Sequence, residues 1–229
     1  MKMFATIDIK KFEDETFLNE TLANISKFRR EKYEAMNNPT GKFQVLANTY
    51  LLNKCLNELN LNEKDMEYAI EKNGKLRFIN APNIHFNLSH SKNMSLAVIS
   101  DKPVGCDIQF VGKVDEKLYD LVLSEYEKRI VKGNCTNPVG DECKFCRGEC
   151  LQSPTSVGAD TIRPHPVGAS STSSAEKFYE FWAMKEAIIK KDGTGLRDRL
   201  TDVYDDNVYI EKRFLKNNES VEEYILAII

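Results

Sequence analysis

Residues 178–189 read FYEFWAMKEAII, and residues 43–54 read FQVLANTYLLNK. In both stretches apolar residues recur at intervals of three and four, which predicts two amphipathic helices. Two apolar runs, SLAVI at residues 95–99 and YILAI at residues 224–228, are similar to one another and predict strands. Because these patterns follow in the same order, we expect an α/β (α+β) fold of two similar halves, a pseudo-dimer, that meet near residue 103.

The other elements follow from periodicity and from helix-breaking residues. Apolar spacing predicts one helix from Glu15 to Met36 and another from Lys117 to Lys132. A further helix, residues 175–191, begins after Ser173 with capping-box spacing and ends before Gly193. Short strands are predicted at residues 3–7, 84–88, 104–108 and 208–214.

The composition is that of an ordinary globular protein. Of 229 residues, 41% are hydrophobic and 29% are charged, a balance typical of soluble domains. The net charge of −3 argues against a general nucleic-acid-binding protein, which carries a basic excess. The apolar run from Tyr224 to Ile229 is too short to span a bilayer, and Asp8 falls too early for a signal peptide. We therefore expect a cytoplasmic protein with neither a nucleic-acid nor a membrane partner.

The segment from residue 134 to 174 differs in amino-acid composition from the rest of the chain. It is rich in Gly, Pro, Ser and Thr and holds four of the six cysteines, Cys135, Cys143, Cys146 and Cys150. With His165 they supply enough ligands for a tetrahedral Zn²⁺ ion, but a second Cys-x2-Cys pair is missing. A disordered insertion, a zinc-ordered insertion and a partner-docking segment all stay open. We expect an N-terminal half, residues 1–102, and a C-terminal half, residues 103–229, which this insertion interrupts.

The stretch FNLSHS at residues 86–91 places polar side chains directly after a predicted strand. The hydroxyl of Ser89 and the imidazole of His90 are groups that can hold the phosphate oxygens of a ligand at a strand end. The alternative is a turn whose polar side chains satisfy their own backbone.

The stretch VGCDIQ at residues 104–109 places a carboxylate inside a mostly apolar strand. Such a group is costly to bury unless it is paired or bound to a metal. Asp107 and Gln109 share one face of a strand, because side chains alternate with period two. Two oxygen donors on one face suit Mg²⁺, which takes few protein ligands. The alternative is an aspartate that faces solvent.

The helix of residues 175–191 carries charged side chains at the border of its apolar stripe. These are Lys185, Glu186 and Lys190. Glu186 precedes Lys190 by four residues, the favourable order for an ion pair on a helix. The alternative to a functional role is therefore a surface ion pair on a solvated helix face.

Taken together, these three motifs resemble those of the 4′-phosphopantetheinyl transferases, in the same order along the chain. The closer similarity is to the long type with two halves, which activates peptide and polyketide synthetases. The resemblance extends to the basic cluster RREKY at residues 29–33, to Gly74-Lys75 before the FNLSHS motif, and to Gly193-Thr194-Gly195-Leu196 after the helix. It covers the chain from end to end except for the segment of residues 134–174.

The resemblance implies a Mg²⁺-dependent transfer of phosphopantetheine from coenzyme A to a serine of an acyl or peptidyl carrier protein, with release of 3′,5′-ADP. It implies a monomer whose site lies between the halves. Asp107, Gln109 and Glu186 would hold Mg²⁺, and Glu186, or a water bound to the metal, would take the serine proton. Lys190 and Lys185 would offset phosphate charge. The nucleotide and its 3′-phosphate would be held by Arg29, Lys32, Lys75, Ser89 and His90.

The chain departs from the family pattern at two points. Many relatives have Glu where this chain has Gln109, which leaves one anionic metal ligand fewer. The 79 residues from Asp107 to Glu186 are roughly twice the family's usual spacing, and the surplus is about the length of the cysteine-rich segment. A second hypothesis therefore stays open: a protein of the same fold that binds coenzyme A or a carrier, has lost transfer, and docks through that segment.

Overall fold

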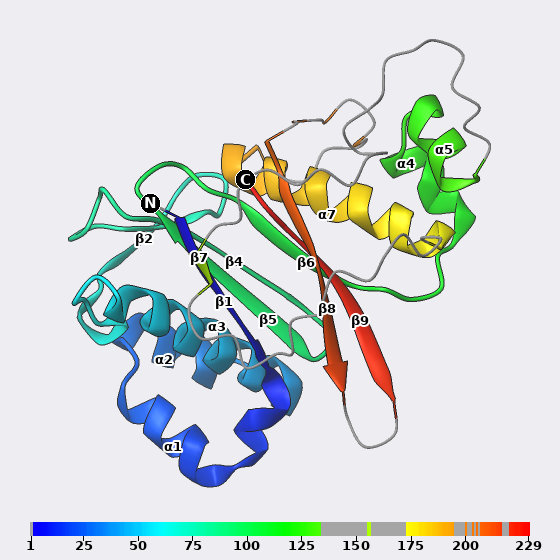
Figure 1. The fold of residues 1–229 in the computed structure, drawn as a ribbon. Coiled ribbons are helices and arrows are strands. Elements are labelled where there is room, and N and C mark those ends of the chain that lie inside the picture. Colours follow the sequence, from blue (N-terminus) through cyan, green and yellow to red (C-terminus); the bar gives the residue numbers. More distant parts are fainter. Residues whose placement is uncertain are drawn as a thin grey trace.

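Two sheets, each covered by one long helix, make up the core (Figure 1). The structure is a computed structural model that describes residues 2–133, 155–156, 173–194, 200, 203, 205, 207–216 and 220–229. In Figure 1, helix α3 (Pro39–Asn57) lies at the lower left and helix α7 (Ser174–Asp192) at the upper right, with the strands between them. The mixed α/β class predicted from the sequence is confirmed.

The first sheet has the strand order β4-β5-β1-β7 and packs against α3. Strand β5 lies antiparallel to both β1 and β4, whereas the two-residue strand β7 is parallel to β1. Ile7 and Ile99 share a buried apolar cluster with Leu51 and Leu52 of the helix. The strands are β1 (Lys2–Asp8), β4 (His85–Ser91), β5 (Met94–Ser100) and β7 (Thr155–Ser156).

The second sheet has the order β6-β9-β8, all antiparallel, and packs against α7. Its central strand pairs with the strand before the helix and with the edge strand after it, as β5 does in the first sheet. The similar sequence stretches are therefore the two long helices and the two central strands. The strands are β6 (Cys106–Phe110), β8 (Tyr209–Lys216) and β9 (Val221–Ile228).

The faces of the two sheets that turn away from the helices meet in a third buried cluster. Phe4 and Leu96 of the first sheet belong to it, as do Ile108, Tyr224 and Leu226 of the second. Their neighbours along each strand face the helices, because side chains alternate across a sheet. The sheets are thus buried on both faces, and β6 lies against β4 and β5.

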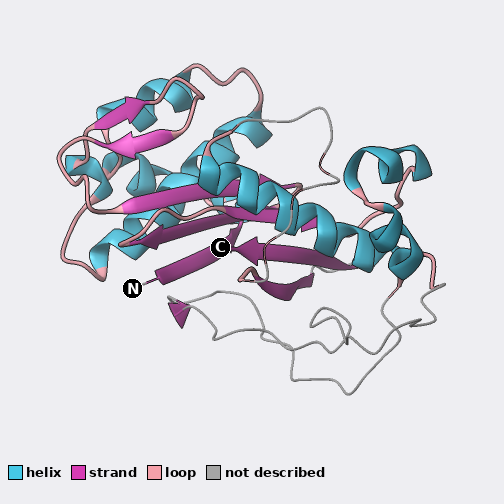
Figure 2. Cartoon of the chain, turned by 90° about the horizontal axis from the view of Figure 1, so that it is seen from above, coloured by secondary structure: helices cyan, strands magenta, loops and turns pink. Residues whose placement is uncertain are grey.

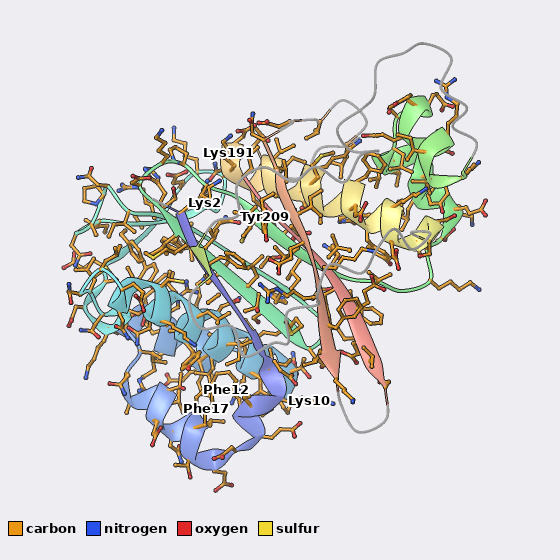
Figure 3. All side chains as sticks on the ribbon, in the orientation of Figure 1. Lys2, Lys10, Phe12, Phe17, Lys191 and Tyr209 are labelled. Carbon is orange, nitrogen blue, oxygen red and sulfur yellow. The ribbon has the colours of Figure 1, made fainter. Side chains whose placement is uncertain are left out.

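Shorter elements surround the two sheets. In both Figure 1 and Figure 2 the β2–β3 hairpin lies at the left edge of the molecule and helices α4 and α5 at the right edge. The rings of Phe12 and Phe17, 5.0 Å apart, join the first 3₁₀ turn to α1 beside α3 (Figure 3). The bounds are α1 (Glu15–Ala23), α2 (Lys27–Glu34), β2 (Tyr68–Ile70), β3 (Leu76–Phe78), α4 (Tyr119–Val122) and α5 (Glu125–Val131), with 3₁₀ turns at Ile9–Glu13, Glu63–Asp65 and Glu116–Leu118.

Two helices predicted as continuous are broken in the structure. The helix expected from Glu15 to Met36 is split into α1 and α2, because the Ser26 hydroxyl accepts a hydrogen bond from the Arg29 N–H and begins a new helix. The helix expected from Lys117 to Lys132 is split in the same way by Ser124, which forms a capping box with Glu127. In both places a serine inside an apolar pattern ends one helix and caps the next.

The ends of α7 are as predicted. Ser173 and Glu176 form a capping box, and Gly193 closes the helix with a φ of 65°, in the left-handed region that favours glycine. Among the helices that the structure describes, none is both long and apolar enough to cross a membrane.

Most of the cysteine-rich segment lies outside the described residues. The predicted zinc ligands Cys135, Cys143, Cys146, Cys150 and His165 are all outside them, so the predictions for this segment stay predictions. The part that is described includes β7, whose Thr155 and Ser156 pair with Met3 and Phe4.

Glu180 on α7 gives a prediction about stability and pH. Burial raises the pKa of this carboxyl to about 7, although Lys212 lowers it in part. The folded state therefore disfavours the ionised form, and stability is lost as the pH rises through about 7. The side chain of Glu180→Gln stays neutral at every pH. We therefore expect the free energy of unfolding of this variant, relative to the unmodified chain, to be higher at about pH 8 than at about pH 5 by on the order of 1 kcal/mol. Urea unfolding at the two pH values measures this gain.

The matched control for this measurement is Glu34→Gln, a substitution of an exposed glutamate. Its effect on the free energy of unfolding should be the same at both pH values. An effect of Glu180→Gln that is equally independent of pH would contradict the prediction.

Candidate functional site

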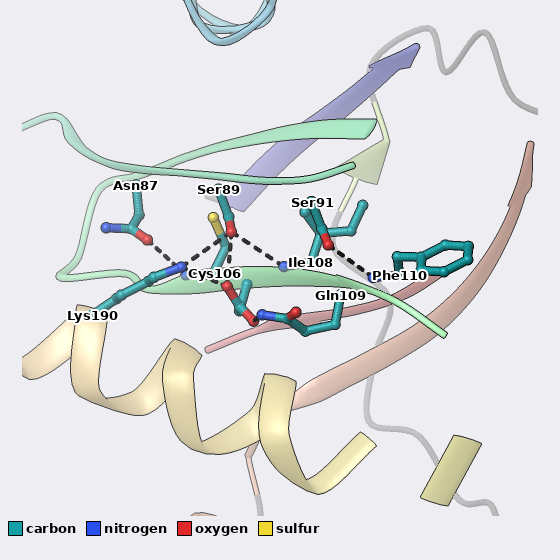
Figure 4. A network of polar contacts seen from close by, with 9 residues as sticks. Asn87, Ser89, Ser91, Cys106, Ile108, Gln109, Phe110 and Lys190 are labelled. Atoms are coloured by element: carbon teal, nitrogen blue, oxygen red, sulfur yellow. Dashed lines mark hydrogen bonds and ion pairs between the residues drawn. The ribbon is translucent and has the colours of Figure 1, made fainter. Parts of the chain in front are cut away.

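Asp107 lies at the centre of a polar cluster from three elements; its partners Ser89, Gln109 and Lys190 are labelled in Figure 4. It projects from β6 and is 1% exposed. Its Oδ1 accepts a hydrogen bond from Ser89 Oγ of β4 at 2.8 Å and lies 2.5 Å from Lys190 Nζ of α7. Its Oδ2 accepts one from Gln109 Nε2 at 2.7 Å. These donors offset the cost of burying the carboxylate, so the alternative of a solvent-facing aspartate is wrong.

Ser89 uses its whole hydrogen-bonding capacity inside this cluster. Its hydroxyl donates to Asp107 and accepts from the Ile108 N–H at 3.3 Å and from Lys190 Nζ at 3.1 Å. A serine hydroxyl has one donor and two acceptor positions, so all three are occupied. A phosphate oxygen bound by Ser89 would have to replace the Asp107 contact.

The FNLSHS motif is not a turn after a strand. Strand β4 continues to Ser91, and Asn87, Ser89 and Ser91 project toward β6. Their side chains bind the backbone of that strand and not their own. Polar residues at every second position produce this edge contact, because a strand places them on one face.

Gly105 lets β6 approach α7 closely enough for Asp107 to reach Lys190. A Cβ atom at this position would lie 1.9 Å from the Ala187 carbonyl oxygen and 2.5 Å from the Lys191 nitrogen. Both are backbone atoms of α7 and cannot rotate away. The glycine of the Gly-x-Asp motif is therefore explained by this contact between strand and helix.

Glu186 is the second carboxylate of the site. It is half-buried, and among the described residues it forms no hydrogen bond or ion pair. Burial and the neighbouring charge of Asp107 raise its pKa, whereas Lys190 lowers it. Burial lowers the pKa of Lys190, but Asp107 and other neighbours outweigh this and raise it overall. One carboxylate is thus paired with the lysine, and the other is left with unused acceptor capacity.

The oxygen donors of the site suit Mg²⁺. Asp107 and Glu186 supply carboxylates, and Gln109 has an amide oxygen besides the nitrogen that it donates to Asp107. Magnesium needs only one or two protein carboxylates when phosphate and water complete its shell. Among the described residues, this site included, no three His, Cys, Asp or Glu side chains gather as a metal site, so a magnesium ion here would depend on two carboxylates, an amide and the ligand's phosphate.

Lys185 does not belong to this cluster. It is 0% exposed and forms an ion pair with Glu127 Oε2 at 2.6 Å, and it donates to the Val122 carbonyl at 2.7 Å. The prediction that it lies at the border of the apolar stripe is wrong. These contacts hold α7 against α4 and α5.

The residues predicted to hold the nucleotide lie in three places. His90 is beside the cluster, where partial burial and Lys190 lower its pKa. Lys75, in the β2–β3 turn, donates to the Lys191 carbonyl at 2.7 Å, and burial lowers its pKa. Arg29 and Lys32 lie in α2, and no described contact joins them to Asp107.

Within α2, the two basic side chains have different surroundings. Arg29 is 4% exposed, with its guanidinium 5.0 Å from the Tyr68 ring and its Nε 4.0 Å from Glu63. Lys32 lies over the Phe28 ring at 5.1 Å, and burial and Arg29 lower its pKa.

Sequence reasoning missed three residues that shape the site. Asn87 and Ser91 bind β6, and Asn73 donates to the Gly193 carbonyl at 2.5 Å beside Lys75. The period-two pattern of Asn87, Ser89 and Ser91 was a usable signal for the first two. Nothing in the local sequence indicates that Asn73 caps a helix 120 residues away.

Comparisons with known proteins agree on one family. A family model described as the 4′-phosphopantetheinyl transferase superfamily matches residues 103–227, which include Asp107, Glu186 and Lys190. The 4′-phosphopantetheinyl transferase ffp of Bacillus subtilis is 24% identical over 173 residues, 75% of this chain and 62% of that protein. The enzyme gsp of Aneurinibacillus migulanus, named likewise, is 24% identical over 184 residues, 80% of this chain and 62% of that protein.

A further 4′-phosphopantetheinyl transferase of Bacillus subtilis is 25% identical over 221 residues, 90% of this chain and 82% of that protein. The chain thus spans less than two thirds of the length of ffp and of gsp, and more than two thirds of the length of this third relative.

The close approach at Gly105 gives a prediction. Gly105→Ala forces β6 and α7 apart, and we expect the free energy of unfolding to fall by about 2 to 3 kcal/mol. Gly112→Ala is the matched control, because its Cβ would meet only the side chains of Phe110 and Tyr179. Urea unfolding of both variants measures the difference. Equal stabilities would contradict the backbone contact described for Gly105.

Proposed function

Because the chain belongs to the 4′-phosphopantetheinyl transferase superfamily, we propose that it transfers the phosphopantetheine group of coenzyme A to a serine of an acyl or peptidyl carrier protein. The product besides the modified carrier is 3′,5′-ADP. The observation that carries the proposal is the cluster of Asp107, Lys190 and Glu186, all inside the matched region.

The reaction joins the carrier's serine oxygen to the phosphorus of the phosphopantetheine group and breaks the bond from that phosphorus to 3′,5′-ADP. We propose that a carboxylate oxygen of Glu186 accepts the serine proton. Three observations support it: the side chain is half-buried, it has no competing partner among the described residues, and burial and Asp107 raise its pKa. Lys190 would offset charge on the phosphates.

We propose that Asp107, Gln109 and Glu186 hold Mg²⁺. A magnesium ion there would neutralise the charge of the pyrophosphate. Lys190 now lies against Asp107 Oδ1, so it has to share or leave that oxygen when a metal binds. The ammonium group of Lys190 would therefore lie close to a metal ion that Asp107 holds.

For the nucleotide we propose His90, Lys75, Arg29, Lys32 and Ser89, as the resemblance implies. His90 and Ser89 are supported by their place next to Asp107. We assign no phosphate contact to Lys185, because it is fully buried against Glu127.

We also propose that the chain is a monomeric pseudo-dimer divided near residue 103, with the site between its halves. Three antiparallel strands follow the same order in both sheets, β4-β5-β1 in the first and β8-β9-β6 in the second, which supports this division. Ser89 precedes the boundary and Asp107 follows it. A cytoplasmic location agrees with the free thiols of Cys55 and Cys106.

One observation favours the second candidate, a coenzyme A- or carrier-binding protein that does not transfer. Gln109 donates its amide to Asp107, a contact that a glutamate there would not make. This contact, together with Ser89 and Lys190, occupies both oxygens of Asp107. Such a protein would bind coenzyme A and leave the carrier unmodified.

A transfer assay decides between the two candidates, and a substitution of Glu186 tests the proposed proton acceptor. The full chain is incubated with coenzyme A, Mg²⁺ and an apo carrier protein, and the carrier is then weighed by mass spectrometry. We expect the phosphopantetheine mass increment, and we expect Glu186→Gln to reduce its rate by at least about a hundredfold. Glu180→Gln, on the same helix but outside the cluster, should leave the rate unchanged. An active Glu186→Gln variant would remove this residue from the mechanism.

Gln109 gives a test of metal dependence. Gln109→Glu replaces the amide beside Asp107 with a third carboxylate, so we expect the Mg²⁺ concentration for half-maximal rate to fall several-fold, on the order of 1 kcal/mol in binding. Without Mg²⁺ the same variant should be less stable, because like charges then lie together. Gln109→Leu is the control and should not lower the Mg²⁺ requirement. A requirement that is unchanged in Gln109→Glu would exclude Gln109 from the metal site.

A further inference from the structure

Strand β6 forms one edge of its sheet, and its backbone donors point in two directions. The N–H groups at the odd-numbered positions face β9: Gly105 donates to Ile229 and Val111 to Glu223, at 3.1 and 2.8 Å. In an antiparallel pair the alternate N–H groups point outward. Those of Cys106, Ile108 and Phe110 therefore have no acceptor in their own sheet and need one elsewhere.

Side chains of β4 supply all three acceptors. Asn87 Oδ1 accepts from the Cys106 N–H at 3.0 Å, and Ser91 Oγ accepts from the Phe110 N–H at 3.0 Å. Between them, Ser89 Oγ accepts from the Ile108 N–H. Each pair is separated by 19 residues in sequence, so the three contacts form one continuous register. Figure 4 shows them in a row along β6.

This register also places the carboxylate of Asp107. Ser89, in the middle of the row, donates to Asp107, and Lys190 reaches the same oxygen from α7.

Other contacts join the two sheets as well. One is the apolar cluster around Phe4, and apolar packing is not directional. At the turn between β4 and β5, Lys92 pairs with Glu222 of β9 at 2.8 Å, and Asn93 donates to the same carboxylate. These polar contacts reach β9, whereas the two outer hydrogen bonds of the row bind the backbone of β6 itself on either side of Asp107, so they oppose sliding of β6 along β4.

We propose that Asn87 and Ser91 are positioning residues, which fix β6 against β4 so that Asp107 stays beside Ser89, Lys190 and Glu186. The inference deepens the proposed function and rests on it for the identity of the reaction. Neither residue touches Asp107 in the structure, so each would act through the backbone of β6.

The test uses variants of equal shape in the full chain. Ser91→Thr and Asn87→Asp keep an oxygen acceptor at the same branch, whereas Ser91→Val and Asn87→Leu present a methyl group in its place. Four quantities are measured: the free energy of unfolding, the exchange rates of the Cys106 and Phe110 amides, Mg²⁺ binding by calorimetry, and kcat and KM for coenzyme A.

We expect the methyl variants, Ser91→Val and Asn87→Leu, to fold, to exchange the amide opposite the substitution faster, and to bind Mg²⁺ about tenfold more weakly. Their kcat should fall about tenfold or more with KM for coenzyme A nearly unchanged, since small misplacements of a reacting group are costly. The acceptor variants, Ser91→Thr and Asn87→Asp, should restore both quantities. A merely structural role would lower stability and leave Mg²⁺ affinity and kcat of the folded protein as they are, and that result overturns the proposal.

Two further outcomes are separated by the same measurements. If the unmodified chain binds Mg²⁺ but transfers nothing, the proposed function fails, and the difference in Mg²⁺ affinity between the methyl and the acceptor variants still decides the positioning role. If the unmodified chain binds no Mg²⁺, both proposals fail. Where a methyl variant does not fold, Asn87→Ala or Ser91→Ala, measured against the unmodified chain, replaces it.

Discussion

The structure depends on how the open edge of β6 finds hydrogen-bond acceptors. A sheet edge leaves every second backbone N–H without a partner, and burying such groups is costly. Here a second sheet supplies side chains in place of another strand, so the two sheets meet without backbone pairing between β4 and β6. The site lies at this joint because Ser89 bonds both the β6 backbone and Asp107.

The charges at the joint are divided unequally between two carboxylates. Asp107 takes the hydroxyl, the amide and the lysine, whereas Glu186 has no such partner among the described residues. Burial and the neighbouring charge of Asp107 raise the pKa of Glu186, so its neutral form is more favoured than in water. Two acids at one site can therefore have different tasks, the first holding a cation and the second exchanging a proton.

Features that depend on residues close together in the chain could be predicted from the sequence. The capping box at Ser173, the end of α7 at Gly193 and the long helices follow from residues close together in the chain. The break at Ser26 was missed, because an apolar period hides a serine that both caps α2 and binds Glu63. Lys185 was misplaced, because a buried ion pair with Glu127 requires knowledge of which helices pack together. The alternative of a turn at the FNLSHS motif is wrong, and the contacts of its side chains with β6 were missed for the same reason: those partners lie 19 residues further on.

Several contacts among the described residues hold helix α7 in place. Its own Ser173 caps the start, Lys185 fixes its middle, and Lys75 and Asn73 bind its last carbonyls. The entropy of closing a loop grows only with the logarithm of its length. The stretch between α5 and α7 can therefore gain or lose many residues during evolution at small energetic cost, without moving Glu186 relative to Asp107.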